Sequence, residues 1–133
     1  MSRKIKDLQN YPIGELCQII DCKNRTPPYV DLSEYLVVRT SNVRNGLLIL
    51  EDIKFTTEEG FIEWTKRGIP RCGDVLFTRE APVGESCLAP KNLRVCLGQR
   101  MILLRPKKKL IDSLFLSFYL LTTKCKREIH QYS

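Results

Sequence analysis

Histidine is nearly absent from this chain of 133 residues, since His130 is the only one. None of the six cysteines form a Cys-x-x-Cys pair. A zinc site needs closely spaced soft ligands, so we expect no metal here. A Ser-His-Asp or Cys-His centre would have to use His130 near the end of the sequence, which disfavours that chemistry. We therefore expect no catalytic residues of these kinds.

The seven glycines include no Gly-x-Gly. A methyltransferase that binds a nucleotide cofactor needs a glycine-rich loop, so we expect no cofactor. One tetrapeptide points the other way, because Thr26-Pro27-Pro28-Tyr29 resembles the Pro-Pro-Tyr motif of adenine N6-methyltransferases. In those enzymes the first residue is normally Asp, Asn or Ser, whereas here it is threonine. A rigid surface loop is the favoured interpretation, and a methyltransferase fragment stays a less favoured alternative.

Long hydrophobic runs are also missing. The longest, around Leu114–Leu121, is far shorter than the ~20 residues that span a bilayer. The basic first ten residues are not followed by the apolar segment of a signal peptide. Several cysteines lie within short apolar runs, as expected of reduced, buried thiols. The sequence thus predicts a soluble cytoplasmic protein without a membrane partner.

Basic residues exceed acidic ones by 22 to 15, which gives a net charge of +7 and a pI of about 9.2. Such a surface attracts polyanions, but charge alone leaves open whether a nucleic acid is bound. A nuclease would need convergent carboxylates around Mg²⁺. Asp52 and Glu63 each have a lysine nearby, but no second acid joins either, so a solvated charged face is the better interpretation.

The chain's length fits one domain, 1–133, with a core of about 11–125. Many short strands without βαβ alternation predict an α+β fold with a strand-rich mixed or antiparallel sheet and two helices. The expected strands are 15–20, 35–40, 47–50, 53–55, 74–78, 86–89, 94–97 and 100–105. Thr56 or Thr57 caps the first expected helix, and Asp112 or Ser113 caps the second. The buried side of the second is expected to contain Leu114, Phe115, Phe118, Leu120 and Leu121.

Polar residues that can contact bases gather before the turn signal Asn45-Gly46. Arginine can bind guanine through two hydrogen bonds, asparagine can bind adenine, and serine suits either. The predicted base contacts are Arg39, Ser41, Asn42 and Arg44. An ordinary polar hairpin turn is an equally good interpretation of these residues alone. The predicted phosphate contacts are Lys66, Arg67, Arg79 and Arg100.

Several segments, taken in order, resemble the target recognition domains of type I restriction–modification specificity subunits. The most specific is Gly73–Glu85 (GDVLFTREAPVGE). Val38–Gly46 (VRTSNVRNG) is similar to a second family segment. Weaker matches are Gly14–Cys17, Phe61–Trp64, Gln99-Arg100 and Phe115–Leu121. Together they cover residues 11–125.

The resemblance implies a double-stranded DNA-recognition module, not an enzyme. A specificity subunit has two such domains separated by long helices, and each domain recognises one half of a split site. It directs a modification methyltransferase subunit and a restriction subunit. Only one domain and no long spacer helix are present here, so we expect a half subunit, a fragment or a free-standing relative. A homodimer is among the expected assemblies. The alternative is a relative that acts only through protein–protein contacts with those subunits.

Overall fold

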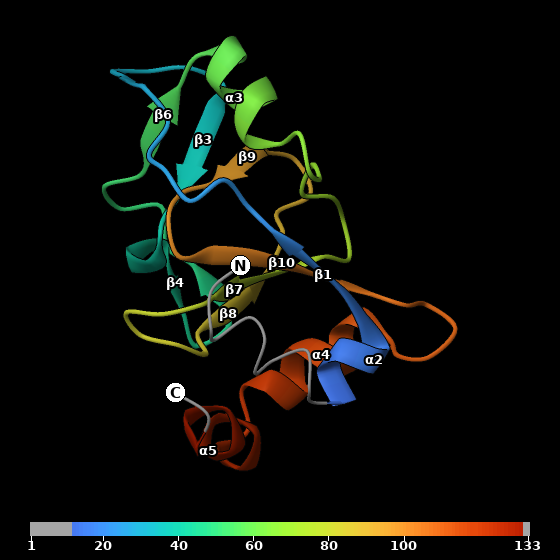
Figure 1. Cartoon of the computed structure of the whole chain (residues 1–133). Coiled ribbons are helices and arrows are strands. Elements are labelled where there is room, and N and C mark those ends of the chain that lie inside the picture. Colours follow the sequence, from blue (N-terminus) through green and yellow to red (C-terminus); the bar gives the residue numbers. More distant parts are fainter. Residues whose placement is uncertain (1–11, 132–133) are drawn as a thin grey trace.

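The computed structural model describes residues 12–131, which form two four-stranded sheets, a short hairpin and helices (Figure 1). The first sheet has the order β1-β10-β7-β8, and all its neighbours are antiparallel. Its strands are β1 (Cys17–Asp21), β7 (Val75–Thr78), β8 (Ser86–Leu88) and β10 (Met101–Pro106).

The second sheet has the order β2-β6-β3-β9, and its β3–β9 pair is parallel. Its strands are β2 (Tyr29–Val30), β3 (Tyr35–Val38), β6 (Lys54–Thr56) and β9 (Arg94–Leu97). The hairpin joins β4 (Val43–Arg44) to β5 (Leu47–Leu48). The mixed, mainly antiparallel α+β architecture agrees with the sequence prediction.

The first sheet is the middle layer of the molecule. Successive side chains of a strand point to opposite faces, and in β10 Ile102 and Leu104 enter one hydrophobic cluster while Met101 and Leu103 enter the other. The first cluster includes Leu116 and Leu120 of the C-terminal helices, and the second includes residues of the second sheet. Because β10 is covered on both faces, its sequence is a continuous apolar run without alternation.

Four helices lie within the described residues, two more than predicted: α2 (Pro12–Leu16), α3 (Glu58–Trp64), α4 (Ser113–Leu120) and α5 (Thr123–Gln131). The start of the strand expected at 15–20 belongs to α2. The predicted caps are confirmed, because Thr57 accepts a hydrogen bond from Gly60 N and Asp112 accepts from Leu114 N and Phe115 N. None of the helices described here has the length and apolar character needed to cross a membrane.

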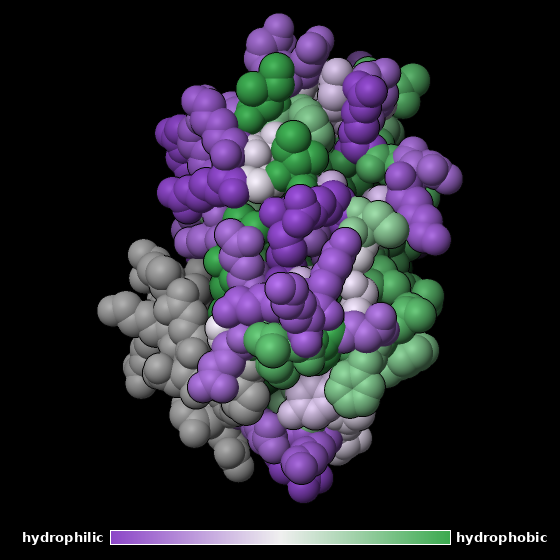
Figure 2. All heavy atoms as spheres, turned by 90° about the vertical axis from the view of Figure 1, so that its right-hand side faces the viewer, coloured by the Kyte–Doolittle hydropathy of each residue, from purple (hydrophilic) through white to green (hydrophobic). Residues whose placement is uncertain are grey.

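The predicted buried side of α4 is largely wrong. Leu114, Phe115 and Phe118 are 56%, 63% and 67% exposed, whereas Leu116 and Leu120 are fully buried. The apolar residues of α4 lie on all sides of the helix, so its sequence contains no periodic signal that identifies the buried face. The docking onto the first sheet selects the face. The exposed residues leave hydrophobic side chains visible on the lower part of the molecule (Figure 2).

Candidate nucleic-acid interface

Three segments far apart in the sequence meet at one end of the second sheet. Because β3 and β9 are parallel, the chain leaves both at the same edge, where Gly98 N donates a hydrogen bond of 2.9 Å to Val38 O. The loop before β2 joins them. Together they line a pocket of about 210 Å³, whose residues are Thr26, Tyr29, Arg39, Thr40, Ser41, Gly98, Gln99 and Arg100.

Two of the predicted base contacts, Arg39 and Ser41, lie in this pocket. Ser41 is exposed on η1, a single 3-10 turn (Thr40–Asn42). The Arg39 guanidinium donates from Nη2 to Asp52 O at 2.8 Å, and its buried Nε has no hydrogen-bond partner among the described residues. These two side chains are therefore held at the surface by the end of β3 and the turn that follows.

Asn42 does not fit its predicted role in base contact. It is fully buried. Its Oδ1 accepts a hydrogen bond of 2.9 Å from Arg39 N, and its Nδ2 donates to Ile49 O at 2.9 Å. Both ends of the side-chain amide are therefore bonded to backbone atoms before and after the turn that contains Ser41. A buried, bonded side chain cannot reach a base edge, so the prediction for Asn42 is corrected to a structural role.

Arg44 and the hairpin turn also differ from the sequence interpretation. Nη1 of Arg44 donates to Thr40 O at 2.9 Å and to Val43 O at 2.7 Å, so the side chain supports η1 from outside the pocket. Asn45 and Gly46 have φ of +49° and +82°, as a tight hairpin requires. However, Gly46 N donates to Ser86 O at 2.9 Å, which packs the turn against β8 instead of projecting it into solvent.

Three of the four predicted phosphate contacts are exposed. Arg100 lines the pocket, while Lys66 and Arg67 follow α3 and lie beside Lys23 and Trp64. Glu63 partly neutralises the positive charge of Lys66 and Lys23. Its carboxylate accepts from Lys66 Nζ at 2.9 Å and from Lys23 Nζ at 3.0 Å, and these hydrogen bonds lower the pKa of Glu63.

Arg79 is the exception, because only 4% of it is exposed. Its Nη2 donates to Asn24 Oδ1 at 2.9 Å, its Nη1 pairs with Asp21 at 3.4 Å, and its backbone N donates to Arg100 O at 2.8 Å. As folded, Arg79 cannot touch a phosphate. It instead connects the loop after β1 to the start of β10. The prediction for Arg79 is thus corrected to a positioning role.

The loop containing Thr26-Pro27-Pro28-Tyr29 forms one wall of the pocket, which the sequence interpretation did not foresee. Hydrogen bonds fix its backbone on both sides: Trp64 Nε1 donates to Arg25 O at 2.7 Å and Thr56 Oγ1 donates to Pro28 O at 2.6 Å. Pro27 is buried and Tyr29 is 45% exposed. The two prolines mark a rigid loop in the sequence, but only the pairing of β2 with β6 brings it to the pocket.

The pocket therefore combines two guanidinium groups, hydroxyl groups, a side-chain amide and an aromatic ring. These belong to Arg39 and Arg100, to Thr26, Thr40 and Ser41, to Gln99 and to Tyr29. These groups suit hydrogen bonding to base edges and contact with phosphates. Within residues 12–131 no three His, Cys, Asp or Glu side chains gather as metal ligands.

The sequence matches the type I restriction modification DNA specificity domain family over residues 5–133. The chain belongs to this family, and it is accordingly a DNA-specificity module of a restriction–modification system. The family is one of recognition domains and not of catalysts. This match supports the family resemblance seen in the sequence. It gives no support to the alternative of a methyltransferase fragment. No curated protein matches the chain significantly.

Two solved structures share the fold. The crystal structure of the HsdS subunit from Thermoanaerobacter tengcongensis is 21% identical, with a TM-score of 0.57 over 90% of this chain. A second structure, described as showing the structural basis of complex assembly and conformational transition of the type I R-M system, is 25% identical to this chain. Its TM-score is 0.56 over 81% of this chain. The present chain spans 35% and 25% of the lengths of those chains.

Proposed function

We propose that this chain recognises one half of a bipartite double-stranded DNA site through the pocket formed by residues 26–29, 39–41 and 98–100. The observation that supports this most is the convergence of the three segments. Each presents polar side chains on a backbone held by hydrogen bonds, and such preorganisation lowers the entropy lost on binding.

In this proposal Arg39 and Ser41 contact base edges, with Tyr29 beside them supplying an apolar surface. Arg100, Lys66 and Arg67 bind phosphates on either side and fix the register of the protein on the duplex. Arg44, Asn42 and Arg79 shape the surface without touching DNA.

We further propose that the chain directs a modification methyltransferase subunit and a restriction subunit to its site. One of the similar solved structures belongs to the assembly of a type I system, which supports this. The other half of the site would be recognised by a second domain of the same kind. A cytoplasmic location fits this role and the six free cysteines of the chain.

Selection of bound sites from random duplexes, followed by affinity measurement on the selected site, tests the proposal. Arg39→Ala should cost about 1–3 kcal/mol in binding and relax preference at one position. Arg94→Ala is the matched control, because Arg94 is an exposed arginine at the opposite end of the β3–β9 pair.

If Arg39→Ala and Ser41→Ala both leave affinity and preference unchanged, the proposed recognition surface is wrong. If the wild-type chain binds no duplex at low salt but co-purifies with methyltransferase or restriction subunits, the protein–protein alternative is supported instead.

A further inference from the structure

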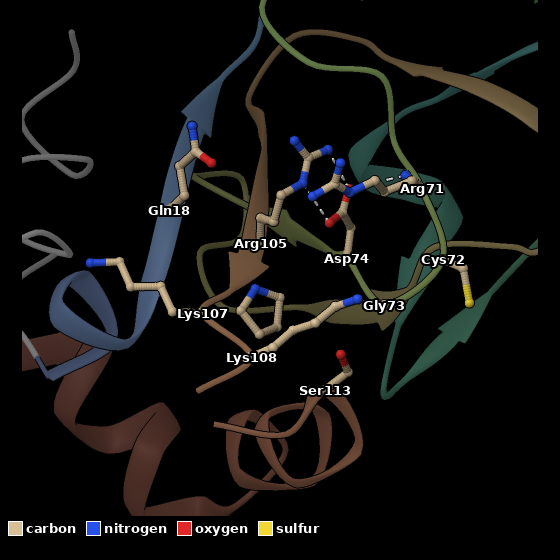
Figure 3. Close-up of a pocket in the computed structure, with 10 residues that line it drawn as sticks. Gln18, Arg71, Cys72, Gly73, Asp74, Arg105, Lys107, Lys108 and Ser113 are labelled. Carbon is tan, nitrogen blue, oxygen red and sulfur yellow. Dashed lines mark hydrogen bonds and ion pairs between the residues drawn. The ribbon is translucent and has the colours of Figure 1, made fainter. Parts of the chain in front are cut away.

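A second, larger pocket of about 550 Å³ lies at the opposite end of the first sheet (Figure 3). Its walls come from the start of β1, the turn before β7, the end of β10 and the first residue of α4. Four residues of β10, 101–104, separate its lining residue Arg105 from Arg100, a span of about 16 Å at roughly 3.3 Å per residue. It is therefore distinct from the proposed base-contacting surface. It lies on the side of the molecule that faces the viewer in Figure 2.

Positive charge dominates this second pocket. Four cationic side chains line it, against one carboxylate: Arg71, Arg105, Lys107 and Lys108 against Asp74. That carboxylate is already saturated, because Asp74 accepts from Arg105 Nε at 2.9 Å, Arg105 Nη2 at 2.8 Å and Arg71 N at 3.0 Å. Arg71, Lys107 and Lys108 form no ion pair with any described residue, so three positive charges remain uncompensated.

The Arg105 guanidinium is fixed in place by these contacts. Its Nη2 also donates to Ile69 O at 3.0 Å, and only 17% of its side chain is exposed. Nη1 has no acceptor among the described residues and is available to a ligand. A guanidinium held in one orientation matches the geometry of phosphate oxygens and loses little entropy when it binds them.

The opposite wall keeps the pocket open. Gly73 has φ of +95°, a conformation that favours glycine, and a Cβ there would lie 3.2 Å from Ser113 Oγ. Ser113 lines the pocket, and its hydroxyl is a further hydrogen-bond donor. Figure 3 shows Lys108 extending across the hollow toward the 71–73 turn, whereas the Lys107 ammonium points away from Asp74. Lys108 and Arg71 thus bring charges without an ion pair among the described residues, and Arg105 is the charge held by hydrogen bonds.

We propose that this pocket is a second anion site that binds a phosphate group, with Arg71, Arg105 and Lys108 as its charged donors and Ser113 as its hydroxyl donor. The phosphate can be carried by a free phosphoester such as a nucleoside diphosphate, or by the backbone of nucleic acid beyond the recognised half-site. Both sources present the same oxygens to the protein, so the chemistry of the pocket is common to them.

NMR titration of the uniformly ¹⁵N-labelled full chain with inorganic pyrophosphate at low ionic strength tests the proposal. We expect saturable shifts confined to the amides of residues 71–74, 105, 107, 108 and 113. The double variant Arg71→Gln/Lys108→Gln should weaken pyrophosphate binding by about tenfold or more, since it removes two charged hydrogen-bond donors. The matched control is Lys124→Gln/Arg127→Gln, which removes the same charge from the exposed side of α5.

Two further arms identify the source of the phosphate. Shifts at the pocket with ADP but not with a duplex lacking the recognised half-site assign a free phosphoester, and the reverse assigns the nucleic acid backbone. Shifts spread evenly over all lysines and arginines, or equal pyrophosphate affinity in both double variants, would overturn the proposal. Arg39→Ala should leave pyrophosphate binding unchanged, so a failure of the DNA-recognition surface is distinguishable from a failure of this site.

Discussion

Arg105 donates two hydrogen bonds to the buried carboxylate of Asp74, one of 2.9 Å from Nε and one of 2.8 Å from Nη2. The pair joins the end of β10 to the turn before β7, and the hydrogen bonds with Asp74 raise the pKa of the Arg105 guanidinium. Removing one member leaves the other charge partly buried without its partner, which is expensive in a protein interior.

Asp74→Asn should therefore lower the free energy of unfolding by about 3 kcal/mol. Urea denaturation monitored by circular dichroism measures this change. Asp31→Asn, which makes the same substitution at an exposed position, is the control and should have little effect. An Asp74→Asn chain as stable as the wild type would show that the pair contributes no net stability.

Asn42→Ala should destabilise the chain by about 2 kcal/mol, because it leaves Arg39 N and Ile49 O without their partner. Asn92→Ala, at an exposed turn position, should change the midpoint of unfolding very little. Should Asn42→Ala retain full stability while altering DNA sequence preference, base contact would be restored as its role.

Glu63→Gln should tighten DNA binding. The substitution releases Lys66 and Lys23 from a carboxylate whose pKa is lowered by their hydrogen bonds, and which therefore stays ionised at neutral pH. The dependence of log K on log salt should steepen by about one unit if one freed lysine meets a phosphate. Glu34→Gln releases Arg94 at the other end of the second sheet and should leave the slope unaltered. Equal slopes for all three proteins would place Lys66 outside the DNA contact.

Thiol labelling of the native chain at pH 8 should modify one cysteine, Cys72, which is the exposed one. Burial raises the pKa of Cys22, Cys87 and Cys96 to about 12, and that of Cys17 and Cys125 to about 11, so these thiols stay protonated and unreactive. Mass spectrometry after reaction with iodoacetamide counts the labels, and Cys72→Ser should reduce the count to zero.

The same raised pKa values predict a loss of stability in alkali. Between pH 9 and about 12 the unfolded chain releases thiol protons that the folded chain retains, so the free energy of unfolding falls as pH rises through that range. Rapid labelling of Cys22 or Cys96 in the folded chain at pH 8 would contradict both expectations.

Leu116→Ala and Leu114→Ala make the same change two residues apart on α4, and they should differ sharply. Leu116 is fully buried against the first sheet, so its loss should cost about 3 kcal/mol through the cavity that remains. Leu114 is 56% exposed and should cost less than about 0.5 kcal/mol. Thermal unfolding of the two variants in parallel makes the comparison, and similar losses would mean that α4 buries a different face.

Local patterns in the sequence were enough to predict the α+β class, the strand at 94–97, the hairpin at Asn45-Gly46 and the starts of two helices. The strand expected at 35–40 ends at Val38, and each helix cap was predicted only as one of two neighbouring residues. The family segments from Gly14 to Leu121 were enough to predict a DNA-specificity module. These features depend on residues that are close together in the sequence, or on short motifs. They can therefore be predicted from the sequence alone.

Only the tertiary structure decided which polar residues face solvent. Asn42 and Arg79 are residue types that can contact DNA, yet both are buried, and their side chains are bonded to Ile49 O and Asn24 Oδ1. Tyr29 and Arg100 lie 71 residues apart in the sequence and share a pocket because β2 pairs with β6 and β3 pairs with β9 in one sheet. The face that α4 buries was likewise set by the sheet beneath it. Burial and pairing across the chain are properties of the packed whole, and no local sequence pattern encodes them.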